Sequence, residues 1–141
     1  MVKTENLHSI INDLNGFDTA CIVGADIVAA KLFASRFKYV VVIDTFNHKD
    51  SLSIFHVNTK EFPNILVIKS PLDYITKSFR NDQFDAVYIS DATSDNALRY
   101  QLTLVSNITK NRIIVPDLDV VRSIMENFDA VIKLDYWHVI A

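Results

Sequence analysis

The segment CIVGADIVAAKLFASRFKYVVVID (21–44) decides the fold class of this chain. It contains most of one short apolar run, 19–24, and the whole of a second, 39–44. Both runs suit strands that are buried on both faces of a sheet. Between them, residues 26–37 repeat apolar positions at helical spacing, and Asp26 stands where it can cap that helix. A buried strand, a helix and a second buried strand predict a βαβ unit with parallel strands.

The same alternation continues along the rest of the chain. Further strands are expected at 64–70, 84–90 and 112–116. Further helices are expected at 3–15, 72–80, 95–108 and 118–128. The stretch 45–63 favours a short irregular helix, although 51–57 also alternates like a strand.

The tail 129–141 predicts two short strands with a tight turn. The expected architecture is therefore one α/β domain over 1–141, with a Rossmann-like, mostly parallel sheet, helices on both faces and an antiparallel C-terminal hairpin strand.

Composition narrows the function classes. The 141 residues carry a net charge of −3, and Lys and Arg are scattered singly, which argues against a nucleic-acid partner. The single cysteine, Cys21, lies in an apolar run and cannot form an internal disulfide, which favours the cytoplasm. No apolar stretch approaches the roughly 20 residues that span a bilayer, so no membrane partner is expected. A small-molecule substrate is expected, and an exposed sheet edge leaves homo-oligomer formation open.

In an open parallel sheet, ligands bind beyond the carboxyl ends of the strands, so the residues there are the site candidates. Asp44 follows a strand and lies 20 residues after Gly24, where an acid would receive the hydroxyls of a nucleoside ribose. The alternative is an Asp that caps a loop or a helix. Asp91, Thr93 and Asp117 could bind a divalent cation or act as a base. Alternatively, Asp91, Thr93 and Ser94 could form an ordinary N-cap cluster, in which Thr93 or Ser94 caps the helix at 95–108. No metal site is assigned.

Together these residues resemble the class I methyltransferases that use S-adenosylmethionine, particularly the small O-methyltransferase-like branch. The likeness runs from about residue 17 to the end of the chain. Besides 21–44, it rests on FPNILVIKSPLDYI (62–75), FDAVYISDATSDNALRYQLTLV (84–105) and RIIVPDL (112–118).

The resemblance implies S-adenosylmethionine as the cofactor and assigns roles to five residues. Gly24 would be the first glycine of the cofactor loop, with Asp26 in the same loop. Asp44 would bind the adenosyl ribose, Ser70 would lie beside the adenine, and Ser90 would stand where the family has its fourth-strand acid. Asp91 or Asp117 would then deprotonate or orient a small acceptor.

The cofactor loop departs from the family pattern, which reads acid-x-Gly-x-Gly-x-Gly. Here residues 22–28 read IVGADIV, so the acid and two glycines are missing, and Asp26 and Val28 carry side chains where the ligand would press. Two functions follow: a minimal methyltransferase, or a protein of this fold that has lost the cofactor and acts as a binding or assembly module. A third is a site for another nucleotide or sugar-nucleotide.

Overall fold

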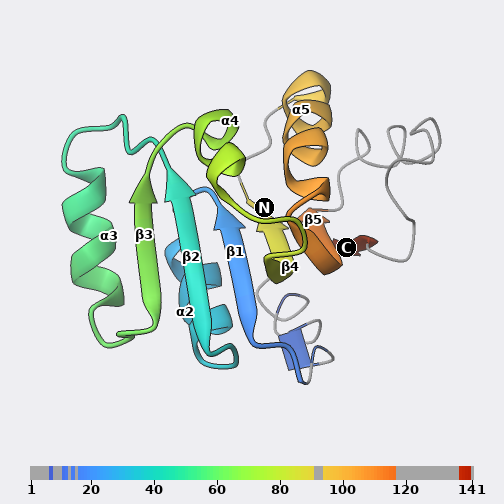
Figure 1. Ribbon diagram of the computed structural model, residues 1–141. Helices are drawn as coiled ribbons and strands as arrows, with labels where there is room; N and C mark the ends of the chain where they lie inside the picture. The colour runs from blue at the N-terminus through green and yellow to red at the C-terminus, as the bar shows by residue number, and fades with distance from the viewer. Residues whose placement is uncertain are drawn as a thin grey trace.

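The strands form one parallel sheet. The computed structural model describes residues 7, 11–12, 14, 16–90, 94–116 and 137–140, and in this part of the chain six strands lie in the order β3-β2-β1-β4-β5-β6 (Figure 1). They are β1 (Thr19–Val23), β2 (Tyr39–Asp44), β3 (Ile65–Lys69), β4 (Phe84–Ile89), β5 (Thr109–Pro116) and β6 (Trp137–Ile140). The strand order reverses between β1 and β4, so that the carboxyl ends of these strands meet at a switch point.

Helices cover both faces of the sheet. They are α2 (Ile27–Ala34), α3 (Ser51–Thr59), α4 (Leu72–Ile75), the 3-10 helix η1 (Thr76–Ser78) and α5 (Asp95–Ser106). Helices α2 and α3 contribute to the core on one face, and α4 and α5 contribute to the core on the other. None of the described helices is long and apolar enough to cross a membrane.

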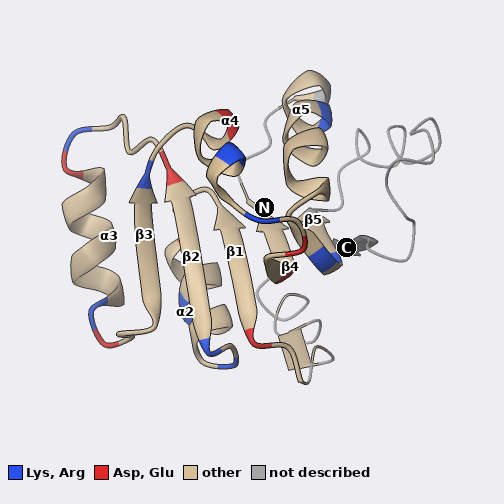
Figure 2. Ribbon diagram, in the orientation of Figure 1, with Lys and Arg blue, Asp and Glu red and all other residues tan. Residues whose placement is uncertain are grey.

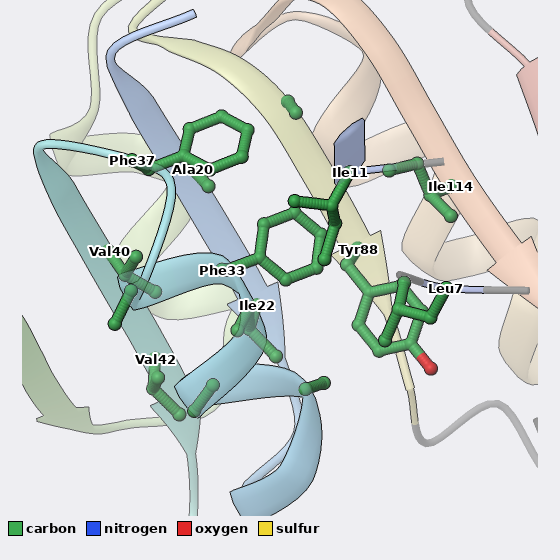
Figure 3. Packing of buried hydrophobic residues seen from close by; sticks show 14 of the residues in the cluster. Leu7, Ile11, Ala20, Ile22, Phe33, Phe37, Val40, Val42, Tyr88 and Ile114 are labelled. Carbon is green, nitrogen blue, oxygen red and sulfur yellow. The ribbon is translucent and has the colours of Figure 1, made fainter. Parts of the chain in front are cut away.

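The core on the α2 face is built around Phe33. Its ring centroid lies 5.3 Å from that of Phe37 and 5.8 Å from that of Tyr88 (Figure 3). Leu7 and Ile11, which the helical spacing of 3–15 predicts on one face, are buried in the same cluster. The rest of that predicted helix lies largely outside the described residues.

Several local predictions are confirmed. Residues 51–59 form helix α3, so the helical interpretation of this stretch is correct and the strand alternative is wrong. The carboxylate of Asp26 accepts a hydrogen bond from the Ala29 N–H at 3.0 Å and caps α2. The hydroxyl of Ser94 accepts from the Ala97 N–H at 3.2 Å and caps α5. Thus short polar residues start these two helices.

The predicted antiparallel C-terminal strand is wrong for Trp137–Ile140. Strand β6 pairs parallel with β5, with Ile113 beside Trp137 and Pro116 beside Ile140. An antiparallel neighbour needs only a tight turn, whereas a parallel one needs a crossover of a dozen residues or more. The connection over 117–136 is long enough for a crossover. The predicted helix 118–128 and the first strand of the predicted hairpin lie outside the described residues.

The crossover from β3 to β4 is short, and it leaves part of the sheet uncovered. The predicted helix 72–80 is four residues of α4 followed by three of η1. Ile65 and Val67 pack on the α2 face, so Leu66 points to the other face, where 60% of its surface is exposed. A mid-strand leucine in a parallel sheet is normally covered by a crossover helix.

The amino end of the sheet is held by Asp85. Its Oδ2 accepts hydrogen bonds from the backbone N–H groups of Asp18 at 2.7 Å and Thr19 at 3.1 Å. These bonds fix the start of β1 against the start of β4, at the end of the sheet opposite to the ligand-binding end.

Candidate functional site

The loop after β1 turns sharply at Gly24. Its φ of 103° lies in the left-handed region, which residues other than glycine rarely adopt. The Gly24 N–H donates to the carbonyl oxygen of Ile43 at 2.8 Å, and the Gly24 carbonyl accepts from the Asp26 N–H at 2.9 Å. Gly24 therefore ends β1, links this end of the strand to β2, and directs the chain into α2.

Asp44, the last residue of β2, joins two loops through its carboxylate. Its Oδ2 accepts from the Ala25 N–H at 2.8 Å, and its Oδ1 accepts from the Phe46 N–H at 2.7 Å. Phe46 has a φ of 51°, which is rare for a bulky residue, and its buried ring packs edge-on against Phe55 with centroids 5.9 Å apart. The Asp44 carboxylate is thus fixed in position before any ligand arrives.

A cavity of about 280 Å³ opens beside Asp44 at the carboxyl ends of β1, β2 and β3. Its lining residues come from these strand ends, from α4 and from α5: Val23, Ile43, Asp44, Thr45, Ser70, Pro71, Leu72, Asp73, Tyr100, Gln101 and Leu104. The wall combines apolar residues with six polar or charged side chains, among them the carboxylates of Asp44 and Asp73. Its volume lies near the lower end of the roughly 300–1,000 Å³ that such pockets span.

Two of the lining residues connect α4 with α5. The Tyr100 hydroxyl donates to Oδ2 of Asp73 at 3.2 Å. Partial loss of hydration, and then the hydrogen bond and the negative charge of Asp73, raise the pKa of Tyr100. This bond lies on the side of the cavity that α4 and α5 form.

Neither Asp73 nor Tyr100 is a candidate from the sequence. Asp73 is inside a predicted helix, and Tyr100 is on the side of the α5 segment away from its inward leucines, Leu98 and Leu102. The sequence signal that could have identified Tyr100 is an aromatic residue on the polar side of an amphipathic helix.

The five predicted cofactor-binding residues gather at the same end of the sheet, but only Asp44 and Ser70 line the cavity. The Ser70 hydroxyl donates to the Pro71 carbonyl at 2.9 Å, and its N–H donates to the Asp44 carbonyl at 2.9 Å. The Ser90 hydroxyl and N–H both donate to the Val23 carbonyl, at 2.8 and 3.0 Å. Ser90 therefore ties β4 to the end of β1.

Asp26 places a negative charge at the beginning of α2. Its Oδ1 accepts from the Ala29 N–H, so it occupies part of the helix terminus that would otherwise attract an anion. Burial, and next the charge of Asp26, raise the pKa of the Tyr88 phenol. The field of Asp26 therefore extends to the end of β4 on the α2 face.

The predicted catalytic residues Asp91 and Asp117, together with Thr93, lie outside the described residues. Within the described ranges, no group of three or more His, Cys, Asp or Glu side chains is placed to hold a metal ion.

Comparison with solved structures identifies similar folds. A candidate RNA methyltransferase from Pyrococcus horikoshii has a TM-score of 0.68 at 18% identity, over 89% of this chain and 63% of that one. The N-methyltransferase NodS from Bradyrhizobium japonicum, in complex with S-adenosyl-L-homocysteine, has 0.64 at 12%, over 85% and 64%. A SAM-dependent methyltransferase from Archaeoglobus fulgidus has 0.60 at 19%, over 78% and 49%.

These likenesses show that the chain has the fold of the class I methyltransferases, as its sequence resemblance predicts. The chain spans between 49% and 64% of the length of these three structures. Comparison of the sequence with protein-family models and with curated proteins gives no match.

Proposed function

We propose that the cavity beside Asp44 binds S-adenosylmethionine through its adenosyl part, and that the protein transfers a methyl group to a small acceptor. The observation that carries this proposal is the fixed carboxylate of Asp44 at the end of β2, in the wall of a cavity that also offers apolar surface. Each carboxylate oxygen has two acceptor positions and uses one for a backbone N–H, so acceptor positions remain for ribose hydroxyls.

The adenosyl part of the cofactor fits the residues present. Val23, Ile43 and Leu72 supply apolar surface for a base, and Asp44 supplies acceptors for the ribose. The bound cofactor would supply the methyl group, carried on a sulfonium. Methyl transfer needs mainly the alignment of donor and acceptor, so the protein's part is to bind, orient and exclude water. Asp91 and Asp117 remain the predicted residues for orienting the acceptor.

The methionine part fits less well, and this favours a second candidate function. The Asp26 carboxylate caps α2, and Val28 is 53% exposed where the family pattern has a glycine. A ligand carboxylate that approached this terminus would meet a like charge. The second candidate is therefore a protein of this fold that no longer binds the cofactor and acts as a binding or assembly module.

Calorimetric titration with S-adenosylmethionine and S-adenosylhomocysteine separates the two. The first function predicts saturable binding of both, which Asp44→Ala abolishes while the variant stays folded by circular dichroism. A flat trace with folded wild-type protein would instead support the module. Competition with other nucleotides tests the third reading, because displacement by an unrelated nucleotide would assign the cavity to that ligand.

We assign this function to the cytoplasm. The single cysteine, Cys21, is free and buried, so the described fold does not depend on an oxidising compartment.

A further inference from the structure

Helix α3 is a surface helix without a charged side chain. Its nine residues include no Lys, Arg, Asp or Glu, and Figure 2 shows it in one colour between charged ends. Surface helices normally carry a polar outer face. On α3, however, 52% of Ile54 and 63% of Val57 are exposed. Exposed apolar surface of this kind, rimmed by charged residues, is typical of a contact surface.

The inner and outer faces of α3 are defined by its packing. Phe55 and Thr59 are buried, and Phe55 contacts Phe46. At 100° per residue, Ser53 and Val57 lie on the side away from Phe55. Asp50 and Lys60, both exposed, directly flank α3 at its amino and carboxyl ends, and with Ser53 and Val57 they have the sequence spacing i, i+3, i+7, i+10; Asp50, Ser53, Val57 and Lys60 are called the outer stripe below. The helix also lies beside β3, which is the edge strand of the sheet (Figure 1).

The stripe is complementary to itself in the reverse direction. Its order is acidic, small, apolar, basic: Asp50, Ser53, Val57, Lys60. Laid antiparallel against an identical helix, it brings Asp50 beside Lys60 of the partner subunit and Ser53 beside Val57 of the partner subunit. A two-fold axis repeats each pair, as in isologous interfaces. The small Ser53 lets the helices approach, and opposite charges meet at both ends.

We infer that the outer face of α3 is the contact between two copies of this chain, packed antiparallel about a two-fold axis. The antiparallel arrangement also places the positive end of one helix dipole beside the negative end of the other. A helix from a different protein could match the apolar residues, but the charge pattern matches a second copy without any further assumption.

Three polar side chains of α3 are already hydrogen-bonded to backbone carbonyl groups. Asn58 donates to the Ile54 carbonyl and Thr59 to the Phe55 carbonyl, each at 2.8 Å. The Ser51 hydroxyl donates to the His48 carbonyl at 2.8 Å. These donors are satisfied within their own turns, so the contact does not leave them without an acceptor.

The expected dimer is weak because the contact is small. Nine residues at about 1.5 Å each give a helix about 14 Å long. Interfaces below about 1,200 Å² belong to the weak and transient class. Association should therefore depend on protein concentration and decrease at high salt, because the charges at its ends are exposed.

Sedimentation velocity over a concentration series tests the inference on the full chain. Wild type should shift from monomer towards dimer as the concentration rises. Val57→Asp buries a charge in the contact and should raise the dissociation constant by at least about tenfold. Leu66→Asp is the matched control, because Leu66 is as exposed as Val57 but points away from the α2 face. It should associate like wild type.

A second variant tests the register. Lys60→Glu places an acid beside Asp50 of the partner subunit, so it should weaken association at low salt and recover partly at high salt. Wild type that stays monomeric throughout would overturn the inference. So would a dimer that Leu66→Asp dissociates and Val57→Asp does not, because that result would assign the contact to the uncovered sheet face. Circular dichroism confirms that each variant is folded.

Discussion

Asp44 and Asp85 hold opposite ends of the sheet, and each carboxylate accepts two backbone N–H groups, Asp85 through one oxygen and Asp44 through both. Asp85 accepts from Asp18 and Thr19 at the amino ends of the strands. Asp44 accepts from Ala25 and Phe46 at the carboxyl ends. Only Asp44 lies beside the cavity. Variants at the two residues can therefore distinguish support of the backbone from the proposed binding of a ligand.

Asp44→Asn should lose more stability than Asp85→Asn. Each oxygen of Asp44 accepts one backbone N–H, so an amide NH2 in place of either oxygen leaves one N–H without its partner. Both backbone N–H groups at Asp85 bond to Oδ2, so the amide oxygen of Asp85→Asn can keep them. For Asp44→Asn the expected loss is about 1–3 kcal/mol in the free energy of unfolding, measured with urea. Only Asp44→Asn should also weaken binding of S-adenosylhomocysteine, by about tenfold or more. An equal loss of affinity in Asp85→Asn would contradict a direct role for Asp44.

Gly24→Ala tests the turn after β1. A Cβ at a φ of 103° is strained and should cost about 1–2 kcal/mol of stability. Gly16→Ala is the control, because Gly16 has a φ of 86° and an added Cβ there meets no atom within 4 Å. Both variants should lose stability in urea, but only Gly24→Ala should lower affinity for S-adenosylhomocysteine. Unchanged binding in Gly24→Ala would mean that the loop does not shape the site.

Asp26→Asn tests the electrostatic obstacle at α2. Asparagine caps a helix about as well as aspartate, so stability should change by only a few tenths of a kcal/mol. If the methionine carboxylate lies near this terminus, removal of the charge should raise the affinity for S-adenosylhomocysteine several-fold. Asp26→Ala should give a similar gain in affinity with a loss of about 1 kcal/mol in stability. A lower affinity in Asp26→Asn would instead show that Asp26 binds the amino group of the ligand.

Tyr88→Phe should change the stability profile in alkali. Burial and the charge of Asp26 raise the pKa of Tyr88 above that of an unfolded tyrosine, about 10. Below that pH the phenol is neutral in both states, and its contribution to stability is complete. Above it the unfolded chain releases the proton while the folded chain keeps it, so stability falls by up to about 1.4 kcal/mol per pH unit.

Tyr88→Phe removes this loss, so its free energy of unfolding should fall less steeply than that of wild type above about pH 10. Burial also raises the pKa of the Cys21 thiol, so ionisation of this thiol in the unfolded chain lowers stability in alkali as well. This part of the loss should be the same in wild type and in Tyr88→Phe. Tyr74→Phe is the control, because Tyr74 is an exposed tyrosine. Equal slopes for wild type and Tyr88→Phe would contradict the prediction.

The parallel sheet was predictable because the residues of each strand and helix are enough to identify that element without its neighbours in space. The run before Gly24 and the run that ends at Asp44 are apolar on both faces, and a capped helix separates them. The direction of β6 was not predictable, because an apolar four-residue strand has the same pattern in either direction. Its pairing depends on the connection that precedes it.

The candidate site was predictable only where it depends on strand ends. Asp44 and Ser70 follow from the rule that ligands bind beyond the carboxyl ends of parallel strands. Asp73 and Tyr100 do not, because they reach the cavity through the packing of α4 against α5, which no local pattern encodes. The two hydrogen bonds of Asp44 to backbone N–H groups were equally invisible, since they depend on how two loops meet.

Because the crossover between β3 and β4 is short, this connection is the best place in the described chain to insert additional residues. Residues 70–83 connect two strands over a sheet face on which the apolar side chain of Leu66 is already exposed. A longer amphipathic helix inserted there would find a surface to bury without any change to the sheet, and it would gain about 25 cal/mol for each Å² of apolar area removed from water. An engineer who wants a larger, more stable version of this protein should lengthen the chain at this connection first.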